Sequence, residues 1–193
     1  MNIHKIVSLQ EFKKVAYESA IEIQRLFPNL YFGHAGLIPA VDENFLKYDC
    51  SPTNTNIFAM TGGDGVQYSI LEISKEIQPV VMTVPMNFGH SMKDYNKVLA
   101  ENLNEFLSIG YFNGWFPLEQ LYYQNDWAID FYSQEDQEQE YQEGAEIQFV
   151  KKLRYFFGYN HIPLKNRRLL ELENNYFDML QFKDYFKIIS EIH

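Results

Sequence analysis

The amino-acid sequence predicts an α+β fold in which helices flank a central antiparallel sheet. The first observation is a three-stranded meander between residues 57 and 84, where short apolar strands are separated by reversals. The second is that apolar residues recur at helical spacing on both sides of this stretch. The chain has 193 residues and 46% hydrophobic content, enough for one domain with a sizeable core. We therefore expect a single domain over residues 1–193, with an N-terminal helix at 8–27, a sheet at about 57–85 and a helical C-terminal part at 133–190.

The predicted meander depends on the turn chemistry of residues 61–65, Thr-Gly-Gly-Asp-Gly. Glycine reaches positive φ without steric cost and aspartate tolerates it, so this run is typical of a tight reversal. The second strand, 66–73, begins with alternating apolar and polar side chains, which predicts that Gln67 and Ser69 face water. The third strand, 80–84, has little polar content, as expected for a strand covered on both faces.

The N-terminal helix 8–27 begins with a candidate capping box, because Ser8 and Glu11 are placed to satisfy first-turn amides reciprocally. Residues at helical spacing predict its buried stripe: Phe12, Val15, Ala16, Ser19, Ile23, Leu26 and Phe27. The following segment, 29–55, is rich in Gly, Pro and Asn and is expected to form a loop with a short helical turn over 42–48.

After the meander, Asp94 or Asn96 is expected to cap a helix that ends at Gly110 as a left-handed C-terminal glycine. Its apolar stripe comprises Leu99, Leu103, Phe106 and Leu107. On this helix Glu101 and Glu105 are four residues apart, so they are expected to share one exposed face.

Four further segments follow from the pattern. Pro117 is suited to start a short helix through Tyr123, because its missing N–H is no loss in a first turn. Residues 127–132 are compatible with a strand or a loop. A helix is predicted over 133–157, and it begins only near Gly144 if that glycine interrupts it. A last helix is predicted from about Asn166. Its residues spaced for burial are Leu169, Leu172, Tyr176, Phe177 and Leu180.

Composition narrows the class of protein. The formal net charge of −10 argues against a protein that binds nucleic acid or anionic membranes, since both functions need a basic surface. The same charge fits a protein whose partner is electropositive. The single cysteine, Cys50, cannot form an internal disulfide, which suits a reducing compartment. The N-terminus lacks the apolar run of a signal peptide, and no apolar stretch approaches about 18 residues, so a cytoplasmic protein is expected.

No catalytic or metal-binding motif is recognisable. The glycine-rich turn is followed by Val66 and Gln67, whereas a phosphate-binding loop needs Lys-Ser/Thr and a helix. The five histidines have no ligand spacing, and nothing around Cys50 would lower the pKa of a nucleophilic thiol. We therefore assign no catalytic residue, metal or cofactor, and keep as an alternative a pocket near Asp64 in which His34 and His90 meet.

Acidic and aromatic residues offer candidates for partner binding. The acidic run at 135–146 is either a docking surface for a basic partner or a solvated helix face, the commoner case. The aromatic residues of 111–123 are expected to be mostly core, and an exposed subset would anchor an interface. The candidate partner-binding residues are Asp64, Glu101, Glu105, Trp115, Glu119, Glu135, Asp136 and Glu138.

Five segments in order resemble a known family. Residues 58–66, FAMTGGDGV, and 79–86, PVVMTVPM, are similar to two signatures of the SUKH superfamily, the Smi/Knr-like immunity domains. The helix ENLNEFL at 101–107 resembles its G-E-N-L-x-E-F-L segment, with Ala100 in place of the usual glycine. GWFPLEQL at 114–121 and the run from Phe156 to Pro163 resemble its later segments. The resemblance covers roughly residues 57–165.

The resemblance implies an α+β fold and a cytoplasmic immunity protein that binds and neutralises a cognate toxin, in many cases a nuclease. No catalytic residues are established across that family, so none is carried over. Direct nucleic-acid or membrane binding is not expected, and the oligomeric state is left open. The alternatives are an intracellular regulatory or scaffolding interaction module, as in fungal relatives, and a small-ligand-binding protein or hydrolase with a pocket near Asp64.

Overall fold

The computed structural model describes residues 7–29, 32–40, 47–87, 89–133, 144–158 and 161–183. Its centre is a five-stranded antiparallel sheet in which the spatial order of the strands follows the chain. The strands are β1 (Ile38–Pro39), β2 (Asn56–Met60), β3 (Gln67–Ile70), β4 (Val80–Thr83) and β5 (Asn96–Ala100). The predicted meander is confirmed as β2–β3–β4, and one strand is added at each edge.

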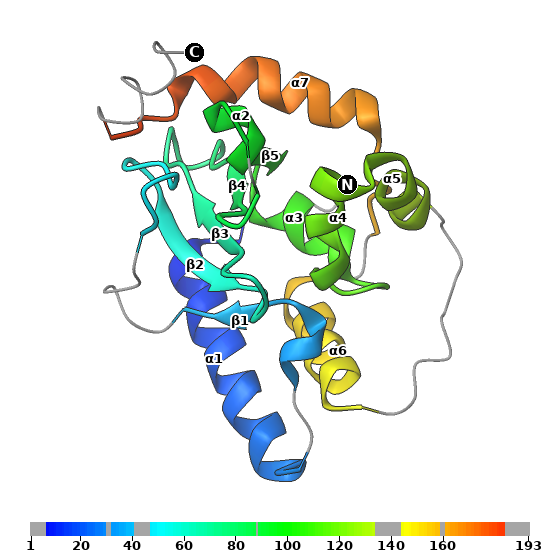
Figure 1. Ribbon diagram of the computed structural model, residues 1–193. Helices are drawn as coiled ribbons and strands as arrows, with labels where there is room; N and C mark the ends of the chain where they lie inside the picture. The colour runs from blue at the N-terminus through cyan, green and yellow to red at the C-terminus, as the bar shows by residue number, and fades with distance from the viewer. Residues whose placement is uncertain are drawn as a thin grey trace, which may run out of the picture.

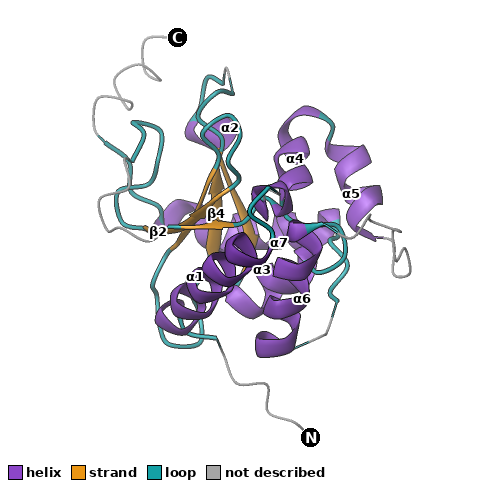
Figure 2. Ribbon diagram, turned by 90° about the horizontal axis from the view of Figure 1, so that it is seen from below, coloured by secondary structure: helices purple, strands orange, loops and turns teal. Residues whose placement is uncertain are grey.

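Helices cover both faces of the sheet, which confirms the α+β class (Figures 1 and 2). One face packs against helices from both ends of the chain, and the other is covered by the last long helix (Figure 1). The helical elements are α1 (Leu9–Leu26), η1 (Phe32–Ala35), α2 (Met92–Tyr95), α3 (Leu103–Gly110), η2 (Phe116–Glu119), α4 (Gln120–Tyr123), α5 (Asn125–Ser133), α6 (Ala145–Phe157), α7 (Asn166–Tyr176) and η3 (Phe177–Met179).

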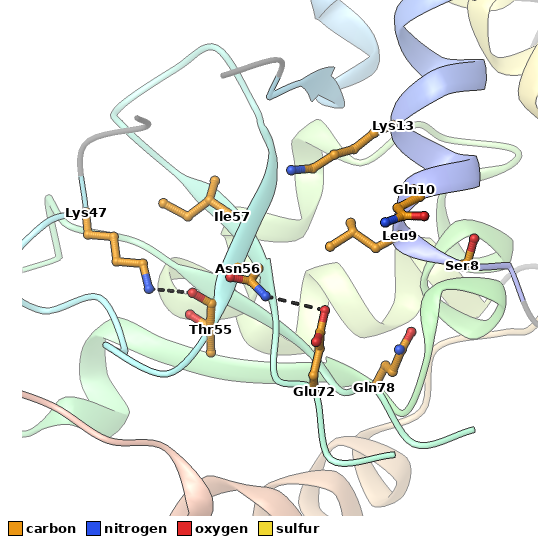
Figure 3. Close-up of a pocket in the computed structure, with 10 residues that line it drawn as sticks. All are labelled: Ser8, Leu9, Gln10, Lys13, Lys47, Thr55, Asn56, Ile57, Glu72 and Gln78. Carbon is orange, nitrogen blue, oxygen red and sulfur yellow. Dashed lines mark hydrogen bonds between the residues drawn. The ribbon is translucent and has the colours of Figure 1, made fainter. Parts of the chain in front are cut away.

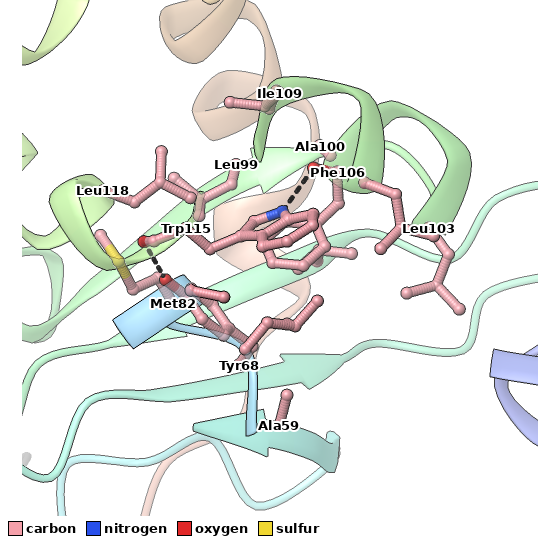
Figure 4. Close-up of a cluster of buried hydrophobic side chains, with 14 of the residues drawn as sticks. Ala59, Tyr68, Met82, Leu99, Ala100, Leu103, Phe106, Ile109, Trp115 and Leu118 are labelled. Carbon is pink, nitrogen blue, oxygen red and sulfur yellow. Dashed lines mark hydrogen bonds between the residues drawn. The ribbon is translucent and has the colours of Figure 1, made fainter. Parts of the chain in front are cut away.

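The main core lies between the sheet and helices α1, α3 and α6, and Trp115 is fully buried within it (Figure 4). The indole Nε1 of Trp115 donates to the Phe106 carbonyl at 3.1 Å. The Tyr68 hydroxyl donates to the Trp115 carbonyl at 2.8 Å. These bonds satisfy the indole N–H and the phenol hydroxyl of two large buried rings. The rings therefore contribute their apolar area to the core without leaving those polar groups unpaired.

A second apolar cluster lies on the opposite face of the sheet, under α7. It comprises Leu71, Val81, Val98, Leu172, Tyr176, Phe177 and Leu180. This cluster corrects the prediction for β3: Gln67 and Ser69 are buried instead of facing water. Alternation correctly separated the two faces of the strand, but other parts of the chain cover the polar one: the Ser51 hydroxyl, from the loop before β2, donates to the buried Gln67 side chain at 3.3 Å.

The N-terminal helix is confirmed as α1. The Ser8 hydroxyl accepts a hydrogen bond from the backbone N–H of Glu11 at 3.2 Å, as an N-cap should. Phe12, Ala16 and Ile23 are buried as predicted, whereas Leu26 is 56% exposed at the last turn. The last turn of α1 extends beyond the surface that the helix covers, so the helical spacing of apolar residues overestimates the burial of Leu26.

The prediction of a helix from Asp94 or Asn96 to Gly110 is wrong in its first half. Residues Asn96–Ala100 form the edge strand β5, and α3 begins later, with Asn102 as N-cap accepting from the Glu105 amide at 3.0 Å. A short apolar run such as Val98–Ala100 fits a buried strand as well as a helix. Gly110 is the last residue of α3 and is not left-handed.

The remaining helices partly match the prediction. The short helix from Pro117 to Tyr123 is confirmed as η2 and α4, and the last helix as α7. Residues 127–132, expected as a strand or a loop, belong to helix α5. Helix α6 begins after Gly144, its N-cap, while residues 134–143 of the predicted 133–157 helix lie outside the described ranges. The helical turn over 42–48 also falls largely outside them.

Candidate functional site

The net negative charge of the chain comes from one stretch of sequence. Residues 98–150 hold 11 of the 26 carboxylates and no Lys, Arg or His, whereas the rest of the chain holds 15 carboxylates and 16 Lys or Arg. This stretch begins in the middle of β5 and ends within α6. An electropositive partner would therefore be drawn to the part of the molecule that this stretch forms.

Glu101 and Glu105 belong to this stretch, yet the molecule already neutralises them. Arg168, on α7, donates from Nε to Glu105 at 2.7 Å and from its Nη2 atom at 3.0 Å, and it lies 3.5 Å from Glu101. The Tyr176 hydroxyl donates to Glu101. Burial is the larger cause and this hydrogen bond the next, and together they raise the pKa of Tyr176 to about 12. These two glutamates do not form the exposed face expected of them. They fasten α7 to β5 and α3.

Trp115, also a candidate contact residue, is completely buried. Its ring packs between α3 and the sheet, so it supports the surface without forming part of it (Figure 4). Three other candidates, Glu135, Asp136 and Glu138, lie outside the described residues.

Asp64 projects from the tight turn between β2 and β3. Its φ of 46° is left-handed, and Gly62 and Gly65 flank it at φ of 85° and 72°. The turn is closed by backbone bonds from Thr61 to Val66 and from Val66 to Gly63, both 3.1 Å. Asp64 is exposed, and the predicted hairpin turn is confirmed.

Glu119, at the end of η2, lies close to this turn. It is only 8% exposed, and burial raises the pKa of its carboxyl group. The charge of Asp64 raises this pKa further, while a hydrogen bond with Gln120 opposes the rise. Neither Asp64 nor Glu119 has a cationic partner among the residues that the structure describes. Two carboxylates thus lie near one another, and the described ranges place no compensating cation beside them.

Two exposed aromatic rings adjoin these carboxylates. Phe116 is 38% exposed, and its ring lies against the turn, because a Cβ atom on Gly63 would be 3.3 Å from it. Tyr123 is 49% exposed, and its pKa is raised by partial burial and then by the charges of Glu119 and Asp64. We call Asp64, Phe116, Glu119 and Tyr123 the turn site.

Helix α5 extends the acidic and aromatic character from α4, against which it packs. Asp126 and Asp130 are exposed and four residues apart, so they lie on one side of the helix. Trp127 is 47% exposed and stacks on Phe131 with ring centroids 4.9 Å apart. These residues were not among the predicted candidates because residues 127–132 were expected to form a strand or a loop, although the spacing of four between Asp126 and Asp130 was the available signal.

A pocket of about 700 Å³ opens elsewhere, between the start of α1 and β2 (Figure 3). Its lining residues are Ser8, Leu9, Gln10, Lys13, Lys47, Thr55, Asn56, Ile57, Glu72 and Gln78. The ammonium group of Lys47 donates to the carbonyls of Pro52, Thr53 and Thr55, and burial lowers its pKa. Asn56 donates to Glu72 at 3.4 Å. Because Lys47 is held by the backbone and Glu72 by Asn56, the geometry supplies no nucleophile paired with a base.

The described residues also contain no metal constellation and no membrane span. No group of three or more His, Cys, Asp or Glu among them is arranged to hold a metal ion. His34 and His90 are both exposed, on η1 and in the loop before α2. Within the same ranges, every helix is too short or too polar to cross a bilayer.

Comparisons with known proteins give no counterpart for this chain. No protein-family model, no curated protein and no solved structure matches it.

Proposed function

We propose that this chain is a non-enzymatic immunity protein that binds and neutralises a cognate protein toxin, with a basic nuclease domain as its partner. The observation that carries the proposal is the acidic stretch 98–150, which holds the exposed aromatic rings of Phe116, Tyr123 and Trp127 and the carboxylate of Glu119, for which the described residues supply no cation. The similarity of residues 57–165 to SUKH immunity domains supports it independently. In this role the protein acts in the cytoplasm.

Charge and aromatic anchors contribute differently to such binding. A concentrated negative field raises the association rate with a basic protein and disfavours acidic competitors. Tight binding needs desolvated anchors at the centre of the interface, where Tyr and Trp dominate. Tyr123 and Trp127 are exposed on consecutive helices within the acidic stretch, so both requirements are met on adjoining elements.

The test is a binding titration against the toxin domain encoded beside the gene, combined with an assay of that toxin's activity. We expect a saturable complex with a dissociation constant below micromolar, loss of toxin activity at equimolar ratio, and an association rate that falls as salt is raised. The absence of a complex at micromolar concentration would contradict the proposal.

A regulatory interaction module would use the same surface on a host protein, and gene context separates the two functions. A neighbouring gene for a large toxin with a C-terminal nuclease favours immunity, whereas its absence favours regulation. A small-ligand function would use the pocket of Figure 3. That pocket contains neither Asp64 nor a histidine, so it does not support the alternative as we framed it, a pocket near Asp64 in which His34 and His90 meet.

A further inference from the structure

Building on the proposed function, we infer that the turn site is a receptor for one arginine side chain of the partner. The guanidinium group would lie between the carboxylates of Asp64 and Glu119, against the rings of Phe116 and Tyr123. The inference rests on three features of the site: its uncompensated charges, its exposed rings, and its likeness to an arginine site that the molecule has already filled.

Within the described part of the chain, no cation pairs with the two carboxylates of the turn site. Glu119 is more than nine-tenths buried, and the nearby charge of Asp64 makes its ionised form still less favourable. No Lys, Arg or His among the described residues compensates either group. A cation placed between them would relieve both the repulsion and the desolvation of Glu119.

The exposed rings favour a guanidinium over an ammonium group. A planar guanidinium stacks on aromatic faces and directs several N–H donors to carboxylates at once, whereas an ammonium is a compact charge that holds its water more tightly. Phe116 lies beneath the turn, and Tyr123 is within electrostatic reach of both carboxylates. The site therefore offers both carboxylates and rings, which is the combination that arginine uses fully.

The same molecule contains a filled site of this composition. Glu101, Glu105 and Tyr176 surround Arg168, and both glutamates lie within 3.5 Å of its guanidinium. Asp64, Glu119 and Tyr123 are likewise two carboxylates and a tyrosine, brought together from a turn and two short helical elements. No arginine among the described residues occupies this second site, and we assign that arginine to the partner.

The turn site is also held in place before binding. Phe116 packs against Gly63, and a Cβ atom on Gly65 would lie 2.6 Å from the Tyr48 hydroxyl, so the turn is fixed on both sides. Glu119 follows Leu118, which is fully buried. A rigid site loses little conformational entropy when it is occupied, and this strengthens binding.

The test uses N-acetyl-arginine amide as a probe in NMR titrations of the whole chain, with the neutral isostere N-acetyl-citrulline amide as ligand control. We expect saturable millimolar shifts of the amides of residues 62–65 and 116–123 with the arginine probe alone. Asp64→Asn and Glu119→Gln should each weaken its binding about ten-fold, the loss of one charge-assisted contact. Glu18→Gln, an exposed carboxylate on α1, is the matched control and should change nothing.

The inference is overturned if both probes shift the same resonances equally, or if Asp64→Asn and Glu119→Gln bind the arginine probe as the unaltered chain does. Dispersed amide spectra of both variants establish that they fold. The same variants should weaken binding of the neighbouring toxin, whereas Glu18→Gln should not. Failure of the proposed function has a different signature: the unaltered chain binds the arginine probe but forms no complex with the toxin.

Discussion

The indole of Trp115 lies directly on the backbone of Gly110, at the last turn of α3. A Cβ atom at residue 110 would be 2.2 Å from Cε2 of the indole, far inside van der Waals contact. The indole is fixed there by its bond to the Phe106 carbonyl, one turn earlier in the same helix. Glycine is therefore needed at this position for close packing, and not for the left-handed conformation that its place near a helix end suggested.

We expect Gly110→Ala to destabilise the protein. Alanine favours a helix over glycine by about 1 kcal/mol, but overpacking a core costs about 1–3 kcal/mol, and contact with a buried ring places this site at the upper end. The net loss should be about 1–2 kcal/mol in urea-induced unfolding. Trp115→Phe removes part of the ring, so in the double variant the alanine should cost less than it does alone. Equal costs in both backgrounds would show that the two residues are not coupled.

The sequence predicted those parts of the fold that are determined locally. The glycine-rich turn at 61–65 and the N-cap at Ser8 depend on residues adjacent in the chain, and both were placed correctly. Burial of Gln67 and the position of the strand Asn96–Ala100 involve distant segments, because Ser51 bonds to Gln67 and α7 packs against β5 from about 70 residues further along the sequence. Periodicity carries no information about such distant coverage.

For the candidate site, composition indicated the residue types but not their pairing. Asp64 and Glu119 were both selected as candidates, and the fold brings them together. Glu101 and Glu105 looked equivalent to them in sequence, but Arg168 compensates these two glutamates from α7. Only the tertiary structure distinguishes a carboxylate with an internal cation from one without.

Arg168 connects α7 to α3, and its loss should weaken that connection. Its side chain is about one-third exposed, so solvent screens the ion pairs, but the paired Glu105 carboxylate is largely buried. We expect Arg168→Ala to lower the free energy of unfolding by about 1–2 kcal/mol, and by less at high salt.

The neighbouring Arg167→Ala is the matched control for this substitution. The side chain of Arg167 is 91% exposed and pairs with Glu171 on its own helix, so the expected loss is below about 0.5 kcal/mol. Similar losses for the two variants in urea titrations would contradict the role given to Arg168.

Ser69 and Thr83 are buried hydroxyl residues on neighbouring strands with opposite hydrogen-bond status. The Ser69 Oγ atom has no hydrogen-bond partner among the described residues, whereas Thr83 Oγ1 donates to Asn96 Oδ1 at 2.8 Å. Burying an unpaired hydroxyl is unfavourable, so Ser69→Ala should leave stability unchanged or raise it by up to about 1 kcal/mol. Thr83→Ala should cost about 1–2 kcal/mol. Thermal unfolding of both variants measures the contrast, and a large loss for Ser69→Ala would reveal a partner for its hydroxyl.

Glu119 gives the folded protein a pH dependence whose sign is fixed by its surroundings. Burial and Asp64 raise the pKa of this carboxyl group above its ordinary value of 4.5, so the folded state binds its proton more tightly than the unfolded state does. The ionised group therefore opposes folding above the raised pKa. This penalty is relieved as pH falls through that pKa towards 4.5, and is absent below it. Glu119→Gln has no ionised form, so it should be more stable than the unaltered chain at neutral pH, with the difference vanishing by about pH 4.5.

Urea unfolding of both proteins between pH 4 and pH 8 measures this difference. Asp64→Asn should narrow the pH range of the effect, because it removes the neighbouring charge that contributes to the rise in pKa. A stability difference that is constant across the whole range would show that the Glu119 carboxyl group titrates normally. If Glu119→Gln is more stable and yet binds the arginine probe more weakly, the carboxylate is retained at a cost to folding, as expected when its charge serves binding.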